Sequence, residues 1–154
     1  MADQKKVQIK NRKARFEYEI LDKYTAGIVL RGTEIKAIRE GKASIAESFC
    51  EFSNGELFVI NMTIQEYSHA THFNHSPKSE RKLLLNRSEL KKLEKEVKNT
   101  GLTIIPLLLY TNEKGLAKLE IALCRGKKQY DKRESIKDRD TKRDLSRIKK
   151  SFNN

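Results

Sequence analysis

The dipeptide Asn54-Gly55 constrains the fold of this chain more than any other local feature, because it separates two apolar, alternating runs. Asn-Gly between such runs is typical of a two-residue β-hairpin, since both residues accept the positive φ angles of a type I′ turn. The runs occupy residues 45–52 and 57–62. The sequence therefore predicts an antiparallel β-hairpin, and with it an antiparallel sheet.

Further strands are predicted on both sides of this hairpin. Apolar and charged residues alternate over 16–20, and 26–30 continue the strand pattern. Residues 63–80 read as a strand fragment followed by a loop, and 81–85 as another strand. Residues 102–111 form a long apolar run in which Pro106 indicates an edge strand or a bulge. After a turn at 112–115, the alternation of Leu119, Ile121 and Leu123 with charged residues predicts a closing hairpin with one solvated face.

Two segments have helical character instead. Thr33 can cap a helix over 34–40 that ends at Gly41, and Ser88 can cap a second helix that continues to about residue 98 and ends at Gly101. In the second helix Leu90, Leu93 and Val97 form one apolar stripe, and the lysines of the opposite face are predicted to meet solvent.

Short antiparallel strands without a βαβ rhythm favour a small barrel or sandwich, with an open α+β sheet as the alternative. The 154 residues suffice for one domain with appendages. No apolar run approaches the roughly 20 residues of a membrane span, and the N-terminus lacks a signal-peptide pattern, so we expect a cytoplasmic protein that does not contact membranes.

The net charge of +12 is concentrated at the two ends of the chain. Residues 1–15 carry +5 and residues 127–154 carry +6, whereas residues 16–126 are nearly neutral. We therefore divide the chain into a basic N-terminal arm (1–15), a folded domain (16–126) and a basic C-terminal tail (127–154) that is expected to be disordered alone and helical when bound. Cationic ends suit a polyanion such as RNA, although solvated tails that merely aid solubility are the alternative.

Catalytic and metal-binding patterns are weak. His69, His72 and His75 are spaced so that neither a strand nor a helix brings all three together, so no metal or other cofactor is expected. Imidazoles that face solvent or RNA are the favoured interpretation. Cys50 and Cys124 are predicted to be reduced thiols packed in the core. No nucleophile motif or phosphate loop is present, which predicts that the chain is not an enzyme.

The beginning of the tail is more specific. Gly126 lets the chain leave the last strand, the cations Lys127, Lys128 and Lys132 can meet phosphates, and Tyr130 offers a ring on which a base can stack. A solvated linker is the alternative interpretation of these residues.

Four motifs, in order NRKARFEYEI, AGIVLRGTEIKAIREGKASIAES, RKLLLNRSEL and GKKQYDKRESIKDRD, resemble the small protein B family, the SsrA-binding proteins of trans-translation. The resemblance spans roughly residues 9–150. It implies an OB-fold-like closed antiparallel β-barrel with two to three α-helices and a basic C-terminal tail. It also implies binding to the tRNA-like domain of transfer-messenger RNA and its delivery to stalled ribosomes. Elongation factor Tu and alanyl-tRNA synthetase would then be indirect partners, through the RNA.

The resemblance assigns roles to particular residues. Asn11, Tyr18, Leu84 and Lys118 match positions of the family's RNA-binding surface. To these we add, as further RNA-binding candidates, Arg12, Arg15, Lys36, Arg81, Lys82 and Asn86. The residues matching the tail that probes the ribosomal decoding centre and messenger channel are Gly126, Lys127, Lys128, Tyr130, Asp131, Lys132 and Arg133.

Two positions depart from the family's pattern. Thr25 stands where many relatives have Glu, which weakens a carboxylate contact with RNA at this position. Tyr130 stands where several have His, and either ring can stack on a base. A structural ribosomal or rRNA-binding protein is the alternative function, and a metal-dependent nuclease built on the three histidines is the third hypothesis.

Overall fold

The hairpin predicted at Asn54-Gly55 is present. The computed structural model describes residues 6–70, 72–99 and 101–127, and in it β4 (Phe49–Ser53) pairs with β5 (Glu56–Ile60). Asn54 and Gly55 have φ angles of 52° and 77°, as a type I′ turn requires. The prediction of an antiparallel pair at this point is confirmed.

The sheet closes on itself. Its strand order is β1-β8-β4-β5-β7-β2-β9, and β8 also pairs with β9, so the strands from β8 round to β9 form a ring. The remaining strands of this sheet are β1 (Gln8–Lys10), β2 (Tyr18–Ile28), β7 (Arg81–Leu84), β8 (Leu102–Thr111) and β9 (Ala117–Gly126). Every pairing is antiparallel. The closed arrangement is confirmed, and an open sheet is excluded.

The strands of the ring pair extensively on one side and at only one position on the other. Strand β9 pairs with β2 over nine positions and with β8 over nine positions. Strands β4 and β8, by contrast, share only the pair Cys50–Ile104. Pro106 lies at a register shift in β8, which confirms the predicted bulge, although β8 is flanked by strands on both sides. A second, two-stranded sheet joins β3 (Ala43–Ser44) to β6 (Thr63–Ile64).

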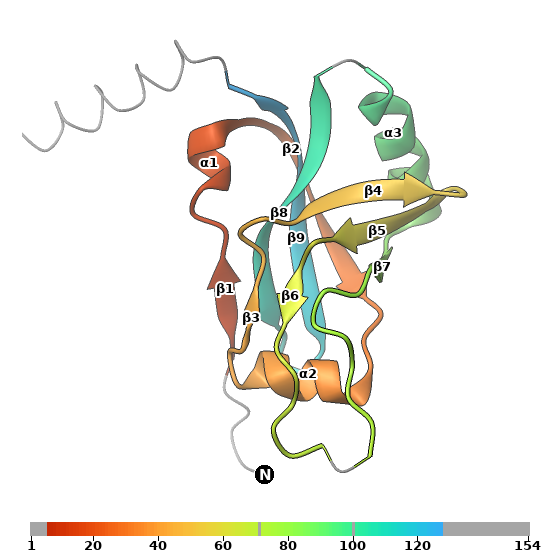
Figure 1. Cartoon of the computed structure of the whole chain (residues 1–154). Helices are drawn as coiled ribbons and strands as arrows, with labels where there is room; N and C mark the ends of the chain where they lie inside the picture. Colours follow the sequence, from red (N-terminus) through yellow and green to blue (C-terminus); the bar gives the residue numbers. More distant parts are fainter. Residues whose placement is uncertain (1–5, 71, 100, 128–154) are drawn as a thin grey trace, which may run out of the picture.

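Three helices accompany the strands in the described part of the chain, and Figure 1 shows α2 and α3 at opposite ends of the molecule. Helix α1 (Ala14–Glu17) precedes β2, so the strand predicted over 16–20 begins only at Tyr18. Helix α2 spans Gly32–Arg39 and α3 spans Arg87–Val97. The helical segments were therefore predicted correctly, apart from the single turn of α1.

The caps of α2 and α3 differ from the prediction. Arg31 rather than Thr33 is the N-cap of α2, and its amide donates to the side chain of Glu34 at 2.9 Å. Asn86 rather than Ser88 precedes α3, and its amide donates to Glu89 at 3.1 Å. In each case the glutamate at the third helical position selects the start of the helix, because its carboxylate satisfies an otherwise free backbone N–H.

The core fills the inside of the ring. The side chains of Leu57, Val59, Leu109, Leu119 and Ile121 are fully buried there. Leu93 of α3 is also buried in this core, with Leu90 and Val97 packed against it, which confirms the predicted apolar stripe. The central cluster holds further residues of α2 and the neighbouring strands, among them Ala37, Ile38, Ile45, Met62, Ile64, Leu83 and Ile104.

A second, smaller cluster lies on the outer side of β8 and β9, where a solvated face was predicted. Ala14 of α1 covers Ile105, Leu107, Ala122 and Cys124. The prediction of a fully wet face on the closing hairpin is therefore wrong at this end of the sheet. The residues of the N-terminal arm explain the difference, because β1 pairs with β8 and α1 folds over the same strands. The structure thus places residues 8–15 within the domain rather than in an arm outside it.

Candidate nucleic-acid interface

The outer side of β7, β2, β9, β8 and β1 carries a group of cationic and exposed side chains that alternate with the buried core positions. We call this surface the basic sheet face, and define it by Lys10, Gly27, Leu84, Tyr110 and Lys118, with Arg15 and Arg39 at its borders. Each of its strand residues neighbours a side chain that points into the ring, as Tyr110 neighbours Leu109.

Leu84 and Lys118 meet across Gly27. Gly27 of β2 pairs with Leu84 on one side and with Lys118 on the other. A Cβ atom at position 27 would lie 3.4 Å from the Leu84 Cβ and 3.8 Å from the Lys118 Nζ. Because Gly27 has no side chain, the ammonium group of Lys118 and the side chain of Leu84 can approach each other above it.

A hollow of about 340 Å³ lies over this point. Leu84 is 51 % exposed and Leu116 is 54 % exposed, and both line it together with Lys118 and Arg39. Arg39 donates from its guanidinium to the Gly115 carbonyl at 3.1 Å, which holds the cation of α2 beside the β8–β9 turn. Apolar surface next to fixed cations can accept a ribose or base and its phosphate together.

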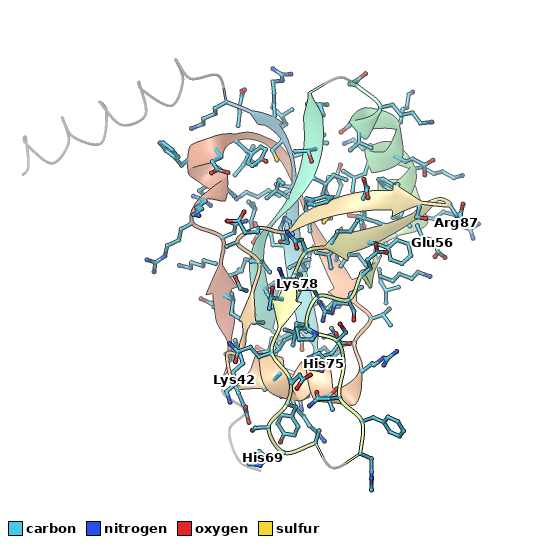
Figure 2. The ribbon with its side chains drawn as sticks, in the orientation of Figure 1. Lys42, Glu56, His69, His75, Lys78 and Arg87 are labelled. Atoms are coloured by element: carbon cyan, nitrogen blue, oxygen red, sulfur yellow. The ribbon has the colours of Figure 1, made fainter. Side chains whose placement is uncertain are left out.

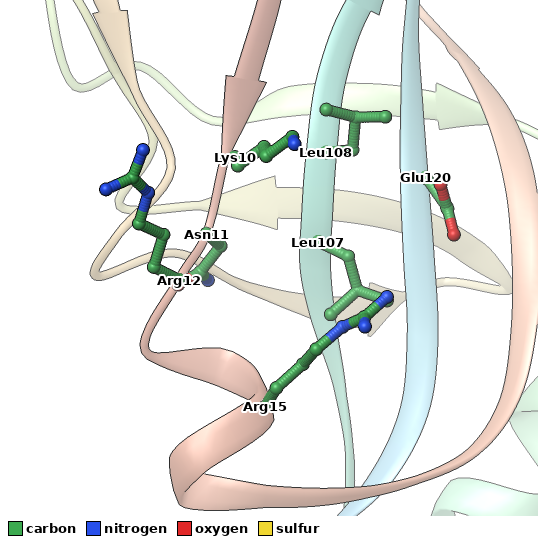
Figure 3. A pocket seen from close by; sticks show the side chains of 7 residues that line it. All are labelled: Lys10, Asn11, Arg12, Arg15, Leu107, Leu108 and Glu120. Carbon is green, nitrogen blue, oxygen red and sulfur yellow. The ribbon is translucent and has the colours of Figure 1, made fainter. Parts of the chain in front are cut away.

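A second hollow, of about 370 Å³, lies between β1, α1 and the outer side of β8 (Figure 3). Lys10 and Arg15 extend from β1 and α1 toward Leu108 and Leu107, whereas Arg12 points away from these strands. Glu120 is the carboxylate that lines this hollow, and Lys23 lies 3.7 Å from it. The hollow is thus cationic on the side of the N-terminal residues.

Asn11 connects this hollow with a smaller one of about 100 Å³ that Tyr18 lines. Its Nδ2 donates to the carbonyls of Ile45 and Pro106, at 3.3 and 3.0 Å. Its Oδ1 is buried and has no hydrogen-bond partner among the described residues. A buried acceptor without a donor costs about 1–3 kcal/mol. Burial is the main reason that the pKa of Tyr18 is raised, and the hydroxyl keeps its proton.

Arg81, one of the predicted RNA-binding residues, is buried and is not presented on the surface of the protein. Its side chain is 2 % exposed and forms an ion pair with the buried carboxylate of Glu34. The guanidinium also donates to the carbonyls of Met62, Ser76 and Pro77, at 2.6, 3.2 and 3.1 Å. The alternation along β7 could have shown this, because Arg81 lies on the same side of the strand as the core residue Leu83.

The other added candidates lie apart from the basic sheet face or are already paired. Lys82 is on the outer side of β7, where it pairs with Glu56 at 2.9 Å. Lys36 lies on α2, with its Nζ 5.6 Å from the centre of the Tyr67 ring. Asn86 serves as the N-cap of α3. The residues that sequence reasoning missed are Lys10, Arg39, Tyr110 and Leu116, of which strand alternation could have indicated Tyr110.

The three histidines do not form a metal site. His75 is buried, with its Nε2 donating to the Ile64 carbonyl and its Nδ1 2.9 Å from the Thr33 Oγ1. His69 and His72 are exposed, and Figure 2 shows His69 well away from His75. The expectation of solvent-facing or RNA-facing rings is therefore wrong for His75. No group of potential metal ligands occurs within residues 6–70, 72–99 and 101–127.

Both cysteines are free and buried, as predicted. Burial raises the pKa of Cys124 to about 12, and it raises the pKa of Cys50 further. Of the predicted tail residues, Gly126 ends β9, and the amide of Lys127 donates to the Glu17 carbonyl at 2.9 Å. Lys128, Tyr130, Asp131, Lys132 and Arg133 lie outside the described residues.

A closed antiparallel sheet with cationic side chains and hollows on its outer face is an arrangement suited to binding nucleic acid. The family model described as "SmpB protein" matches residues 8–151. The chain belongs to the SmpB family.

Relatives and a solved structure agree with this assignment. An SsrA-binding protein of Christiangramia forsetii is 73 % identical over 146 residues, covering 95 % of this chain and 93 % of the relative. That of Flavobacterium psychrophilum is 70 % identical over 148 residues, covering 96 % and 99 %. A solved structure described as "tmRNA-SmpB: a journey to the center of the bacterial ribosome" has 43 % sequence identity and a TM-score of 0.67, covering 84 % of this chain and 94 % of that one.

Proposed function

We propose that this protein binds the tRNA-like domain of transfer-messenger RNA and delivers it to stalled ribosomes for trans-translation. The observation that carries the proposal is the meeting of Leu84 and Lys118 across Gly27, in a family whose members are named for binding SsrA. These names describe binding and no catalysis, which agrees with the prediction that the chain is not an enzyme.

The basic sheet face would hold the RNA. Lys118, Lys10 and Arg15 supply cations for phosphates, and Tyr110, the cross-strand neighbour of Lys118, offers a ring for stacking. Asn11 lines the hollow beside Lys10 and Arg15. On and beside this face, the proposed RNA-binding residues are Asn11, Arg15, Tyr18, Leu84 and Lys118, with Lys10, Arg39 and Tyr110 added. Arg12, Lys36, Lys82 and Asn86 stay in the proposed set as contacts outside the face, and Arg81 is removed.

The tail would act on the ribosome. Gly126, Lys127, Lys128, Tyr130, Asp131, Lys132 and Arg133 are proposed to reach the decoding centre and messenger channel of the small subunit. The site of action would be the cytoplasm, and no helix in the described ranges is long and apolar enough to cross a membrane. Elongation factor Tu and alanyl-tRNA synthetase would be partners through the RNA alone.

Two sets of substitutions test whether the folded domain binds the RNA and the tail acts on the ribosome. Lys118→Gln should weaken binding to the isolated tRNA-like domain by about tenfold, because a phosphate near the centre of the face loses its cation. Lys132→Gln with Arg133→Gln should leave that affinity within about twofold of the wild type and abolish tagging of peptides on stalled ribosomes. Filter binding and a tagging assay in a reconstituted translation system measure the two effects.

Lys114→Gln, which removes one exposed cation outside the proposed set, is the matched control for Lys118→Gln. Loss of RNA affinity in the tail variant, with tagging lost in proportion, would overturn the proposed division of labour. A structural ribosomal protein, the alternative function, would be present in equal amounts on idle and stalled ribosomes, whereas a rescue factor is enriched on stalled ones.

A further inference from the structure

Helix α3 and its C-cap residue, Lys98, carry a row of cations that the proposed function does not use. Arg87, Lys91, Lys95 and Lys98 follow one another at spacings of four, four and three residues. At 3.6 residues per turn these spacings place all four side chains on one side of the helix. All four are exposed. We call this group the α3 ridge.

The carboxylates of α3 are kept out of the ridge. In helical projection Glu94 lies beyond one border of the ridge, while Glu96 and Glu89 lie beyond Lys92 on the other side. The apolar stripe of Leu90, Leu93 and Val97 occupies the remaining side, against the core. The helix is therefore divided into an apolar side, a cationic side and acidic borders.

The described structure provides no counter-ion for the ridge. Lys92, at its flank, pairs with Asp22 at 3.5 Å. None of the four ridge cations forms an ion pair with a carboxylate in the described ranges. Glu56, labelled near Arg87 in Figure 2, pairs with Lys82 instead. Like charges at i and i+4 destabilise a helix by about 0.2–0.5 kcal/mol per pair, whereas Lys95 and Lys98, near its C-terminal end, interact favourably with the helix dipole.

The ridge leads from the basic sheet face to the base of the tail. Arg87 follows Leu84 of that face by three residues. Beyond the other end of the helix, Leu102 pairs with Arg125, immediately before the tail begins. With a rise of 1.5 Å per residue, the ridge is about 16 Å long. In Figure 1, α3 lies at the end of the molecule opposite to α2.

We propose that the α3 ridge binds the phosphate backbone of ribosomal RNA while the basic sheet face holds the transfer-messenger RNA. A row of unpaired cations without an aromatic side chain among them suits a phosphate backbone rather than bases. Ribosomal RNA is the favoured source because the ridge ends at the base of the tail, the segment assigned to the ribosome. The inference rests on the proposed function, and adds a ribosome-binding surface that lies on the folded domain.

Charge neutralisation on the full-length protein tests this inference. The ridge variant is R87Q/K91Q/K95Q/K98Q, since glutamine preserves helix propensity. The control K13Q/K42Q/K78Q/K114Q removes the same charge from exposed sites elsewhere, and Figure 2 shows Lys42 and Lys78 well away from Arg87. Affinity for the isolated tRNA-like domain and for stalled ribosomes is measured from 50 to 300 mM salt, and circular dichroism reports the helix content of each variant.

The ridge variant should bind stalled ribosomes at least tenfold more weakly than the control, and its salt slope should fall by about 0.7–0.9 for each phosphate that is no longer neutralised. Its affinity for the tRNA-like domain should stay within about twofold. Neutralising the flanking carboxylates should have the opposite effect. E94Q/E96Q should strengthen ribosome binding, because it removes negative charge beside the ridge.

Ribosome affinity and salt slope equal to those of the control would overturn the inference, and so would an equal loss of affinity for the tRNA-like domain. If the wild type itself shows no preference for transfer-messenger RNA over bulk tRNA, the proposed function fails, whatever the ridge variant does.

Discussion

The guanidinium of Arg81 is buried, and it donates hydrogen bonds to three backbone carbonyls and pairs with the carboxylate of Glu34. The carbonyls of Ser76 and Pro77 belong to the segment between β6 and β7, and that of Met62 directly precedes β6. His75 ties the same segment to Thr33 and Ile64. These two side chains fix it to α2 and β6, which is a structural role for residues that looked like RNA ligands.

Arg81→Met is expected to lower the free energy of unfolding by about 3–5 kcal/mol, because it leaves the buried Glu34 carboxylate without its partner. Adding Glu34→Leu should recover much of the loss, since no buried charge then remains unpaired. Urea unfolding measures both. Lys82→Met, which breaks the exposed pair with Glu56 on the same strand, is the control and should cost less than about 1 kcal/mol. Equal effects of the two single substitutions would contradict the role assigned to Arg81.

The buried thiols of Cys50 and Cys124 should not react with an aromatic disulfide reagent at pH 8 until the protein unfolds. Burial raises the pKa of Cys124 to about 12, so roughly one molecule in 10⁴ carries its thiolate at this pH. Both thiols should titrate rapidly in 8 M urea. Because unfolded thiols ionise near pH 8.5, their contribution to stability is present below that pH and is lost as the pH rises toward the folded pKa. Rapid reaction of the native protein would show that the core opens there.

Among the secondary-structure elements, those with a local chemical signal were predicted most accurately. The type I′ turn at Asn54-Gly55 needs two positive φ angles, and few residue pairs accept them. The end of α2 is similar, since Gly41 has a φ of 75° and donates to the Ile38 carbonyl while Lys42 donates to that of Ala37. Helix starts were less well predicted, because Thr33 and Ser88 compete as caps with residues two positions earlier, and the glutamates decide.

Gly55→Ala is expected to cost about 1–2 kcal/mol of unfolding free energy, because a φ of 77° places the new Cβ against the following carbonyl. Gly32→Ala is the matched control: it lies in the first turn of α2, has no positive φ and has open space around it. That substitution should be neutral or stabilise by up to about 1 kcal/mol. Thermal unfolding distinguishes the two. A neutral Gly55→Ala would show that the hairpin does not need its turn geometry.

On the scale of the whole molecule, the strand pairs that close the ring differ in length. The β2–β9 and β8–β9 pairs are long, and β4 joins β8 at a single registered position. The core residues that fill the ring all lie between Ile9 and Leu123.

Removing residues 128–154 is expected to leave the thermal midpoint within about 2 °C of the full chain, because the core of the described ranges is built from residues up to Cys124. The affinity for the tRNA-like domain should stay within about twofold. Tagging on stalled ribosomes should be abolished. Calorimetry and filter binding on the shortened chain make the measurement, with the full chain as reference. A large drop in the midpoint would mean that the tail packs against the domain, and the division at residue 127 would have to be moved.

The sequence by itself determined the antiparallel character of the sheet, the hairpin turn, the apolar stripe of α3 and the uneven charge, because each depends on neighbours within a few residues. Only the tertiary structure decided that Arg81 is buried, that residues 8–15 join the domain, and that Leu84 and Lys118 meet across Gly27. These depend on pairings between distant strands, whose register local patterns do not specify. A cation on a strand can face phosphate or carboxylate, and the fold decides which one it meets.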